Sequence, residues 1–163
     1  IDDAWPEARD AGVSQVILVQ AAATAAETGF MLSVAARDDR VAGVVGWTDF
    51  EAPDAAQDIQ RLADTPTIVG LRPMIADIPD PDWILNEAFT PALKAMSETG
   101  LVFDGHAPER LIWGSDWPVL TLAGTYAEWS AQSARLIDRF FPEHAAMIRG
   151  GNARRIYLRG GSN

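Results

Sequence analysis

Strand-like and helix-like segments alternate along almost the whole chain, and this alternation constrains the fold more than any other feature. Apolar runs rich in Val, Ile and Leu predict five strands, at Val13–Gln20, Val41–Trp47, Thr67–Arg72, Leu101–Phe103 and Leu111–Trp113. Each run is followed by a helical pattern or by a turn toward one. Because such alternation is typical of a parallel sheet with helices outside it, the sequence predicts the α/β class.

Helical patterns fill the intervals between these runs. They predict helices at Ala4–Ala11, Glu27–Arg37, Pro53–Ala63, Pro91–Thr99, Glu143–Arg149 and Asn152–Tyr157, and one that runs from Thr125 to Phe140 or Phe141. The expected caps and stops are Thr90, Thr125 with Glu128, Asn152, Gly12 and Gly100. In the second helix, an apolar stripe that we expect to pack on one side consists of Phe30, Met31, Val34 and Ala35.

Composition limits the class of protein. The chain has 163 residues, of which 48% are hydrophobic, so we expect a single domain over residues 1–163 with one core. The absence of Cys excludes disulfides and thiolate metal sites. A net charge of −10 argues against nucleic acid and anionic membranes as partners. The sequence shows neither a membrane-spanning apolar run nor a signal peptide, which favours a cytoplasmic location.

One acidic residue follows the last predicted strand. Gly114 permits a turn after that strand, which places Asp116 at the carboxyl end, where parallel α/β proteins bind their ligands. Trp113 and Trp117 flank Asp116, so we expect the carboxylate to be partly shielded from water and suited to act as a base or a metal ligand. The alternative is a purely structural Asp, since Gly-Ser-Asp-x-Pro is also ordinary turn chemistry.

Six short motifs occur in an order that is similar to a known family. They are Gly43-Val-Val-Gly-Trp47-Thr-Asp49-Phe-Glu51-Ala-Pro53, Gly70-Leu-Arg72-Pro-Met-Ile, Pro79-Asp-Pro-Asp-Trp83-Ile-Leu, Gly100-Leu-Val-Phe-Asp104, Trp113-Gly-Ser-Asp116-Trp-Pro118 and Gly151-Asn152-Ala-Arg. Together they resemble the amidohydrolase-related TIM-barrel metal-dependent hydrolases, near the sugar lactonases and pyrone-dicarboxylate lactonases. The resemblance implies a (β/α)₈ barrel that opens a lactone of a small sugar acid or dicarboxylate. A superfamily decarboxylase and a catalytically dead barrel relic that acts as a binding module remain as alternatives.

The resemblance also implies roles for individual residues. Asp116 corresponds to the acid of the eighth strand, which activates the hydrolytic water or holds a divalent metal. Arg72 is expected to bind a substrate carboxylate or hydroxyl pair, with a salt bridge to a neighbouring carboxylate as the alternative. Gln20 is a candidate hydrogen-bond partner of the substrate, although a strand-end Gln is more often solvated. An aromatic wall against the substrate ring is expected from Trp47, Trp83 and Trp117, each of which has core packing as its alternative.

The chain is too short for the barrel that it resembles. Eight strands need about 250 residues, so roughly 90 are missing. We expect one loss before Ile1, where the family carries a strand with a His-x-His pair, and the absence of an initiating Met fits this expectation. The other loss is expected near Asp104–Gly105, either because residues of a longer protein are left out there, which we favour, or because the gene product has an internal deletion. The first alternative predicts a Cα–Cα separation there far above ~3.8 Å.

Cofactors and partners follow from the same comparison. The resemblance implies one divalent metal such as zinc in the intact protein. Neither His106 nor His144 matches a ligand position of the family, and a zinc site needs three protein ligands, so the residues present support no metal. Asp104 ends the fifth strand of the family pattern and is a weaker candidate for the site. The expected partner is a small-molecule substrate, and a homo-oligomer is compatible with the sequence.

Overall fold

The chain forms two compact units in the computed structural model, which describes residues 1–74, 83, 86–103 and 112–158. One unit comprises Gln15–His106, and the other comprises Ile1–Ser14 together with Ala107–Asn163. The expectation of a single domain over residues 1–163 stays a prediction. Within the described ranges, no helix combines the length and the apolar character that a bilayer crossing requires. The predicted break at Asp104–Gly105 lies outside the described residues.

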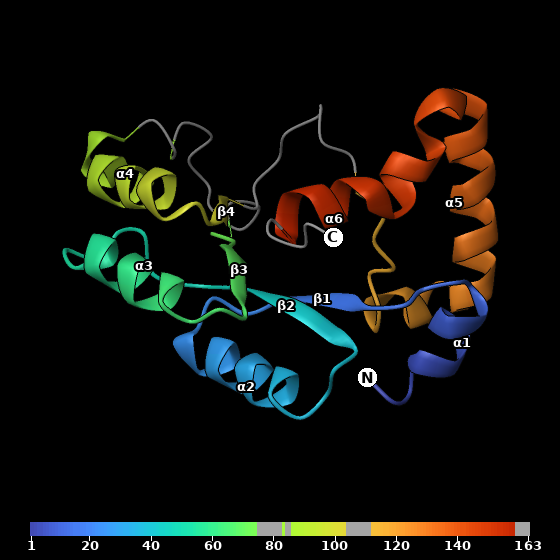
Figure 1. Ribbon diagram of the computed structural model, residues 1–163, viewed down its shortest axis with the longest axis horizontal. Coiled ribbons are helices and arrows are strands. Elements are labelled where there is room, and N and C mark those ends of the chain that lie inside the picture. Colours follow the sequence, from blue (N-terminus) through green and yellow to red (C-terminus); the bar gives the residue numbers. More distant parts are fainter. Residues whose placement is uncertain (75–82, 84–85, 104–111, 159–163) are drawn as a thin grey trace. The chain divides into compact units, whose positions relative to one another are not determined.

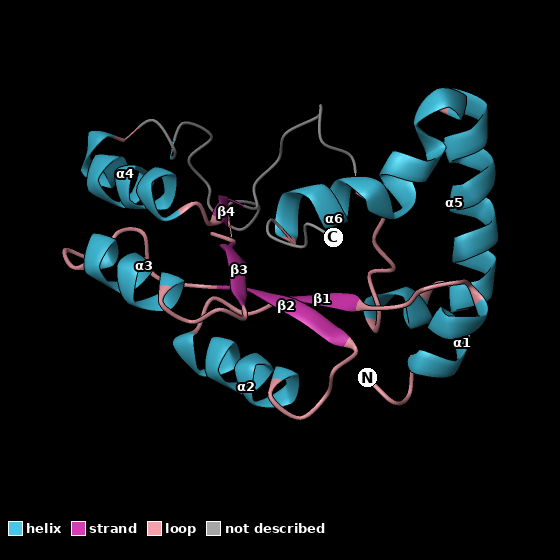
Figure 2. Cartoon of the chain, in the orientation of Figure 1, coloured by secondary structure: helices cyan, strands magenta, loops and turns pink. Residues whose placement is uncertain are grey.

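A parallel four-stranded sheet forms the centre of the Gln15–His106 unit (Figure 2). Its strands are β1 (Val16–Val19), β2 (Val41–Gly46), β3 (Ile68–Leu71) and β4 (Val102–Phe103), which pair in the order β1-β2-β3-β4. The first four predicted strands and their parallel arrangement are therefore confirmed. Each strand is shorter than predicted because its outer residues belong to the connecting loops.

Three helices connect these strands, because neighbouring parallel strands need a crossover between them. They are α2 (Ala25–Ala35), α3 (Ala55–Ala63) and α4 (Thr90–Thr99), with a short 3-10 turn, η3 (Glu87–Phe89), before α4. Helix α2 packs on β2, and α3 packs on β3 and on α4 (Figure 1). Ile59 and Leu62 of α3 are buried as predicted, and they join Val44, Val45 and Leu71 of the sheet in the core.

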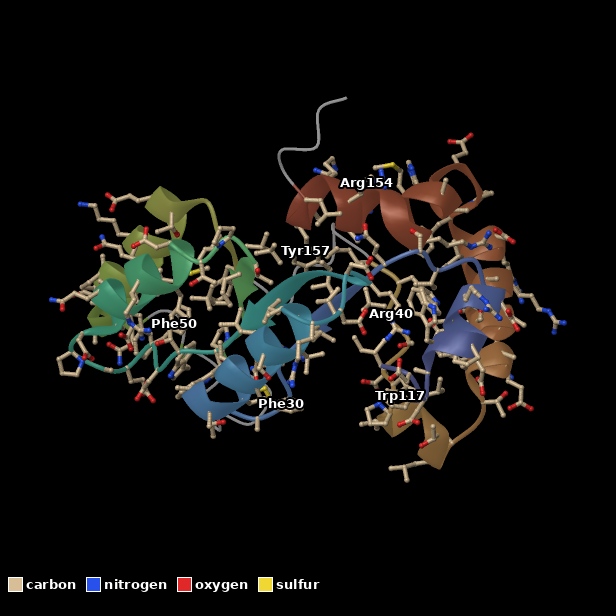
Figure 3. The ribbon with its side chains drawn as sticks, turned by 60° about the horizontal axis from the view of Figure 1, so that its bottom comes forward. Phe30, Arg40, Phe50, Trp117, Arg154 and Tyr157 are labelled. Carbon is tan, nitrogen blue, oxygen red and sulfur yellow. The ribbon has the colours of Figure 1, made fainter. Side chains whose placement is uncertain are left out.

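The structure corrects the apolar stripe of α2. Phe30 is 65% exposed and points away from the core (Figure 3), whereas Thr28 and Met31 are the buried residues of this helix. The sequence pattern counted apolar side chains only, and the helix presents a buried Thr to the sheet instead. At the start of α4, Thr90 is the first helical residue rather than the cap, which is Phe89. Gly100 ends α4 in the left-handed conformation, as predicted.

The second unit is helical within the described residues. It contains α1 (Trp5–Asp10), η4 (Val119–Leu122), α5 (Tyr126–Phe140), η5 (Pro142–His144), η6 (Met147–Gly151) and α6 (Asn152–Tyr157). The capping box of Thr125 and Glu128 is confirmed, with both reciprocal hydrogen bonds present. Asn152 is the first residue of α6 rather than its cap, which is Gly151.

The predicted strand Leu111–Trp113 is not observed. Leu111 lies outside the described residues, and Ile112 and Trp113 have no strand pairing. The amide N–H of Trp113 instead donates to the carbonyl of Ile148, at 2.8 Å. A parallel strand needs neighbouring strands to satisfy its backbone, and the described residues of this unit supply none.

Candidate functional site

Three predicted site residues stand at one edge of the sheet in the Gln15–His106 unit. Gln20, Trp47 and Arg72 are the first residues after β1, β2 and β3. The backbone ladder continues onto this edge, because the N–H of Gln20 donates to Val45 at 3.0 Å and the N–H of Arg72 donates to Gly46 at 2.9 Å. Sheet hydrogen bonds therefore hold the backbones of Gln20 and Arg72, and all three residues follow the carboxyl ends of adjacent strands, as predicted.

The Gln20 side chain is fully buried, which corrects the alternative of a solvated strand-end Gln. Its Nε2 donates to the carbonyl oxygen of Arg72 at 2.8 Å, so it spans from the end of β1 to the end of β3. Its Oε1 has no hydrogen-bond partner among the described residues. A buried acceptor without a partner costs free energy, about 1–3 kcal/mol, and such atoms in native proteins call for an explanation.

Arg72 is half-buried at the same edge. The alternative prediction for this residue was a salt bridge, and its guanidinium forms none with the residues that the structure describes. The Gln20 side chain holds the backbone carbonyl of Arg72, so the backbone position of Arg72 is well defined. Among the described residues its guanidinium has no acceptor, and the planar fork of N–H donors suits a carboxylate or a pair of hydroxyl groups.

The two tryptophans of this unit differ in environment. Trp47 is half-buried, which leaves part of its indole available to a ligand. Trp83 is only 7% exposed and packs on Phe89, with ring centroids 4.4 Å apart. The ring of Trp83 thus packs in the core, which is the alternative stated for it above. Its indole N–H has no acceptor among the described residues.

Asp116 lies in the other unit, on a turn of unusual backbone geometry. Its φ is +53°, and it is the only non-glycine with a positive φ within the described ranges. Asp tolerates this conformation better than most residues, but the conformation still stores strain, which often accompanies functional positions. The side chain is exposed, so the predicted shielding by Trp113 and Trp117 is wrong.

The ring of Trp113 is directed elsewhere, which explains the exposure of Asp116. It meets Tyr126 edge-on, with centroids 5.9 Å apart, and its Nε1 donates to Ser133 Oγ at 2.7 Å. Trp117, labelled in Figure 3, is half-buried. Trp113 therefore anchors the turn rather than covering the carboxylate.

One face of α5 holds this turn, and sequence reasoning did not identify it. Trp129 Nε1 donates to the carbonyl of Gly114 at 2.9 Å, Ser133 Oγ accepts from Trp113, and Tyr126 contacts the Trp113 ring. These three residues follow a spacing of three and four along α5, which places them on one face of the helix. That spacing was the available signal, but two of the three side chains are polar or amphipathic and do not stand out as a core pattern.

A buried tyrosine completes the support of the turn. Burial raises the pKa of Tyr126, a hydrogen bond with Ser115 lowers it by less, and the negative charge of Glu7 adds to the rise. Tyr126 therefore stays a neutral phenol at ordinary pH. Ser115 also accepts a long hydrogen bond, 3.4 Å, from the N–H of Trp117, so this residue links both sides of Asp116 to α5.

The residues described do not fit a metal centre. No group of three or more His, Asp or Glu residues in the described part of the chain is arranged to hold an ion. His144 is exposed on η5, while His106 and Asp104 lie outside the described residues. Asp116 by itself supplies one carboxylate, whereas zinc sites use three or four protein ligands.

Comparison with known proteins identifies a matching family, a relative and two solved structures. The profile of the family described as "Amidohydrolase" matches residues 2–108 and 106–159. An L-fucono-1,5-lactonase of Burkholderia ambifaria is 29% identical over 242 aligned positions, which cover 95% of this chain and 83% of the relative. Because 95% of 163 residues is about 155, about 87 of the 242 positions have no residue in this chain.

Two crystal structures of an amidohydrolase from Burkholderia multivorans share the fold. One contains bound zinc, and its similarity to this chain has a TM-score of 0.73 at 22% identity, covering 96% of this chain and 87% of that protein. The other contains bound HEPES and gives a TM-score of 0.74 at 20% identity, with 96% and 88% covered. The expected α/β barrel class is confirmed, with this chain covering part of the barrel. The chain belongs to the amidohydrolase family.

Proposed function

We propose that this protein is a lactonase that opens the cyclic ester of a small sugar acid or dicarboxylate, with Asp116 as the base that activates water. Membership of the amidohydrolase family and the similarity to an L-fucono-1,5-lactonase support the reaction class. The observation that carries the role of Asp116 is its exposed carboxylate on a strained turn that α5 holds in place. The carboxylate forms no hydrogen bond or ion pair with the described residues, so it is available to water.

The chemistry needs only one proton acceptor to begin. The Asp116 carboxylate takes a proton from water as the water oxygen attacks the lactone carbonyl carbon. The carbon–oxygen bond of the ring then breaks, and the ring oxygen takes the proton back from Asp116 to become a hydroxyl group. The products are a hydroxy acid and the regenerated carboxylate. At neutral pH the new acid releases one proton per turnover.

A metal is not part of this proposal. One structural neighbour contains zinc, and a divalent ion bound near Asp116 would polarise the carbonyl and the water. The described residues do not provide the ligands that such an ion requires. The steps above therefore use only the protein's own side chains.

Each of the two units carries residues that we propose to contact the substrate. We propose that Arg72 binds a carboxylate or a hydroxyl pair, and that the buried Gln20 serves the substrate by holding the backbone of Arg72. Trp47 at the sheet edge and Trp117 beside Asp116 are each half-buried, so each by itself suits contact with the face of a sugar or pyrone ring. The ring of Trp83 packs on Phe89, so we propose that it supports the core of the Gln15–His106 unit rather than touching the substrate. The partner is thus a small molecule rather than a nucleic acid, in keeping with the charge of −10.

The test is a panel of lactones assayed for ring opening and for gas release. Purified protein is mixed with 1,5- and 1,4-lactones of sugar acids and with a pyrone dicarboxylate, and proton release is followed at constant pH. Stoichiometric proton release without carbon dioxide supports a lactonase. Carbon dioxide release would point to the superfamily decarboxylases instead. Failure to turn over any member of the panel would refute the proposal and favour a binding role.

A further inference from the structure

A threonine on α2 pairs with both backbone polar groups of Trp47. Thr28 Oγ1 accepts from the Trp47 N–H at 2.9 Å and donates to the Trp47 carbonyl at 3.3 Å. Trp47 is the first residue beyond β2, where the sheet ladder ends. A single hydroxyl therefore serves Trp47 in the way that a neighbouring strand would, and it extends the order of the sheet by one residue.

This use of a helical threonine is uncommon. A Thr inside a helix usually directs its hydroxyl to solvent or to the carbonyl four residues earlier in the same helix. Thr28 is 3% exposed, and its partner is 19 residues away along the chain. The hydroxyl is thus committed to the loop after β2 rather than to its own helix.

The strand provides the space for this contact. A Cβ placed on Gly46 would lie 2.7 Å from the Thr28 Cγ2 methyl and 3.2 Å from its Oγ1. Both approaches are closer than ordinary van der Waals contact, so a side chain at position 46 would displace the Thr28 side chain from its place against the strand. The glycine therefore allows the hydroxyl to reach the backbone of Trp47.

The neighbouring residue of α2, Glu27, holds the loop after β1. The Glu27 carboxylate accepts from the N–H groups of Ala21 at 3.1 Å and Ala22 at 2.6 Å, directly after Gln20. Glu27 and Thr28 together fix the loops after β1 and β2 from the first turns of one helix. Figure 1 shows α2 lying along these strands. Helix α2 therefore holds Trp47 through its backbone, and it holds Gln20 through the two residues that follow it, Ala21 and Ala22.

We propose that Thr28 is a positioning residue for the lactone site: its hydroxyl fixes the backbone of Trp47 and so sets where the indole meets the substrate ring. This inference rests on the proposed function, because it assumes that Trp47 contacts the substrate. It adds a residue that has no contact with the substrate of its own. Thr28 acts through ground-state and transition-state binding alike, so its loss affects KM more than kcat.

The experiment compares four variants with the wild type. Thr28→Val removes the hydroxyl but keeps the branched shape beside Gly46, and Thr28→Ser keeps the hydroxyl. Gly46→Ala displaces the same contact from the strand side, which keeps the test open if Thr28→Val fails to fold. Ser33→Ala is the matched control, since Ser33 is exposed on α2 and its hydroxyl makes only local contacts: it donates to the carbonyl of Phe30 and accepts from the exposed Arg37. The readouts are KM and kcat for lactone opening and hydrogen exchange of the Trp47 amide.

Thr28→Val and Gly46→Ala should each raise KM roughly tenfold, the equivalent of losing one net hydrogen bond, with kcat changed by less than about twofold. Exchange of the Trp47 amide should accelerate roughly tenfold or more, while amides inside β2 stay protected. Thr28→Ser and Ser33→Ala should match the wild type in all three quantities.

Three results would overturn the inference. The first is an unchanged KM in Thr28→Val despite faster exchange at Trp47. The second is an equal loss in Thr28→Ser, which would assign the effect to packing. The third is uniformly faster exchange throughout β2, which would indicate general destabilisation. A wild-type protein that opens no lactone would instead refute the proposed function and remove the basis of this inference, so the two failures are distinguishable.

Discussion

Replacement of Ser133 by Ala tests whether α5 holds the Asp116 turn. Ser133 is 5% exposed, and its Oγ is the acceptor for Trp113 Nε1 at 2.7 Å. The same hydroxyl donates to the carbonyl of Trp129 at 2.6 Å. Ser133→Ala removes the acceptor without adding volume, so the indole N–H of Trp113 loses its partner and the first residue of the turn loses its attachment to the helix.

The expected cost follows from these contacts. Leaving a buried donor without an acceptor costs about 1–3 kcal/mol, and the half-buried Trp113 places this case in the lower half of that range because water reaches part of the ring. Ala is a better helix former than Ser by about 0.5 kcal/mol, which offsets part of the loss. The Trp129 carbonyl is inside α5 and keeps its helical partner. The net loss in the free energy of unfolding is therefore about 1 kcal/mol, or about 2–4 °C in Tm for a chain of this size.

Urea unfolding followed by tryptophan fluorescence measures this loss. Gln132→Ala is the control, since Gln132 is exposed on the same helix and its replacement gains helix propensity alone. A double-mutant cycle with Trp113→Phe should give a coupling energy of about 1 kcal/mol between positions 113 and 133. If Ser133→Ala is as stable as Gln132→Ala and the coupling is near zero, α5 does not hold the turn through this hydrogen bond.

Three further predictions address the capping box, the sheet and the substrate contact. Hydrogen bonds from the backbone and side chain of Thr125 lower the pKa of Glu128, so the charged carboxylate stabilises the fold above pH 4.5, and this stabilisation is lost as pH falls through the lowered pKa. The difference in unfolding free energy between wild type and Glu128→Gln should therefore shrink between pH 7 and pH 3, and a constant difference would contradict this. Gly70→Ala should lower the free energy of unfolding in urea by about 1–3 kcal/mol, because the new Cβ would lie 2.7 Å from the Val102 carbonyl oxygen. The control Gly29→Ala, whose new Cβ meets no atom within 4 Å, should not destabilise the protein, and equal stability of the two variants would refute the clash. Arg72→Gln should raise KM for an anionic lactone at least roughly tenfold with little change in kcat, and an unchanged KM would exclude Arg72 from substrate binding.

Local patterns predicted the elements that depend on local physics. The parallel strands came from short apolar runs such as Val41–Trp47, because a strand buried on both faces needs no polar alternation. The capping box at Thr125 was readable because its two hydrogen bonds join residues three apart. Gly100 was readable because only a residue that tolerates positive φ ends a helix in this way.

Features that depend on distant residues were not predictable from these patterns. The strand at Leu111–Trp113 needed pairing partners that the described residues lack, so the same apolar run became an anchor for a turn. The burial of Gln20 depends on β1 and β3 ending close enough for one side chain to span β2. The exposure of Phe30 depends on which side of α2 meets the sheet, which a buried Thr decided.

The candidate site was predicted as a set of residues rather than as an arrangement. Gln20 and Arg72 are in direct contact, and Trp47 ends the strand between them. The anchors on α5 and the hydroxyl of Thr28 were missed because their roles appear only through hydrogen bonds to residues far away in the sequence. Sequence motifs do not reveal such supporting residues, although these residues determine the positions of the motif residues.

The most direct test of the account is lactone opening by Asp116→Asn. Asn tolerates the left-handed backbone at φ +53° and has the same shape as Asp, so the variant should fold normally and lose only the ability to accept a proton. Loss of a general base lowers kcat by about 10²–10⁴-fold, and we expect a value in this range together with unchanged circular dichroism and unchanged unfolding. Glu143→Gln, a neutralised exposed carboxylate in the same unit, should retain full activity. If Asp116→Asn keeps the wild-type kcat, Asp116 is not the base and the proposed mechanism is wrong.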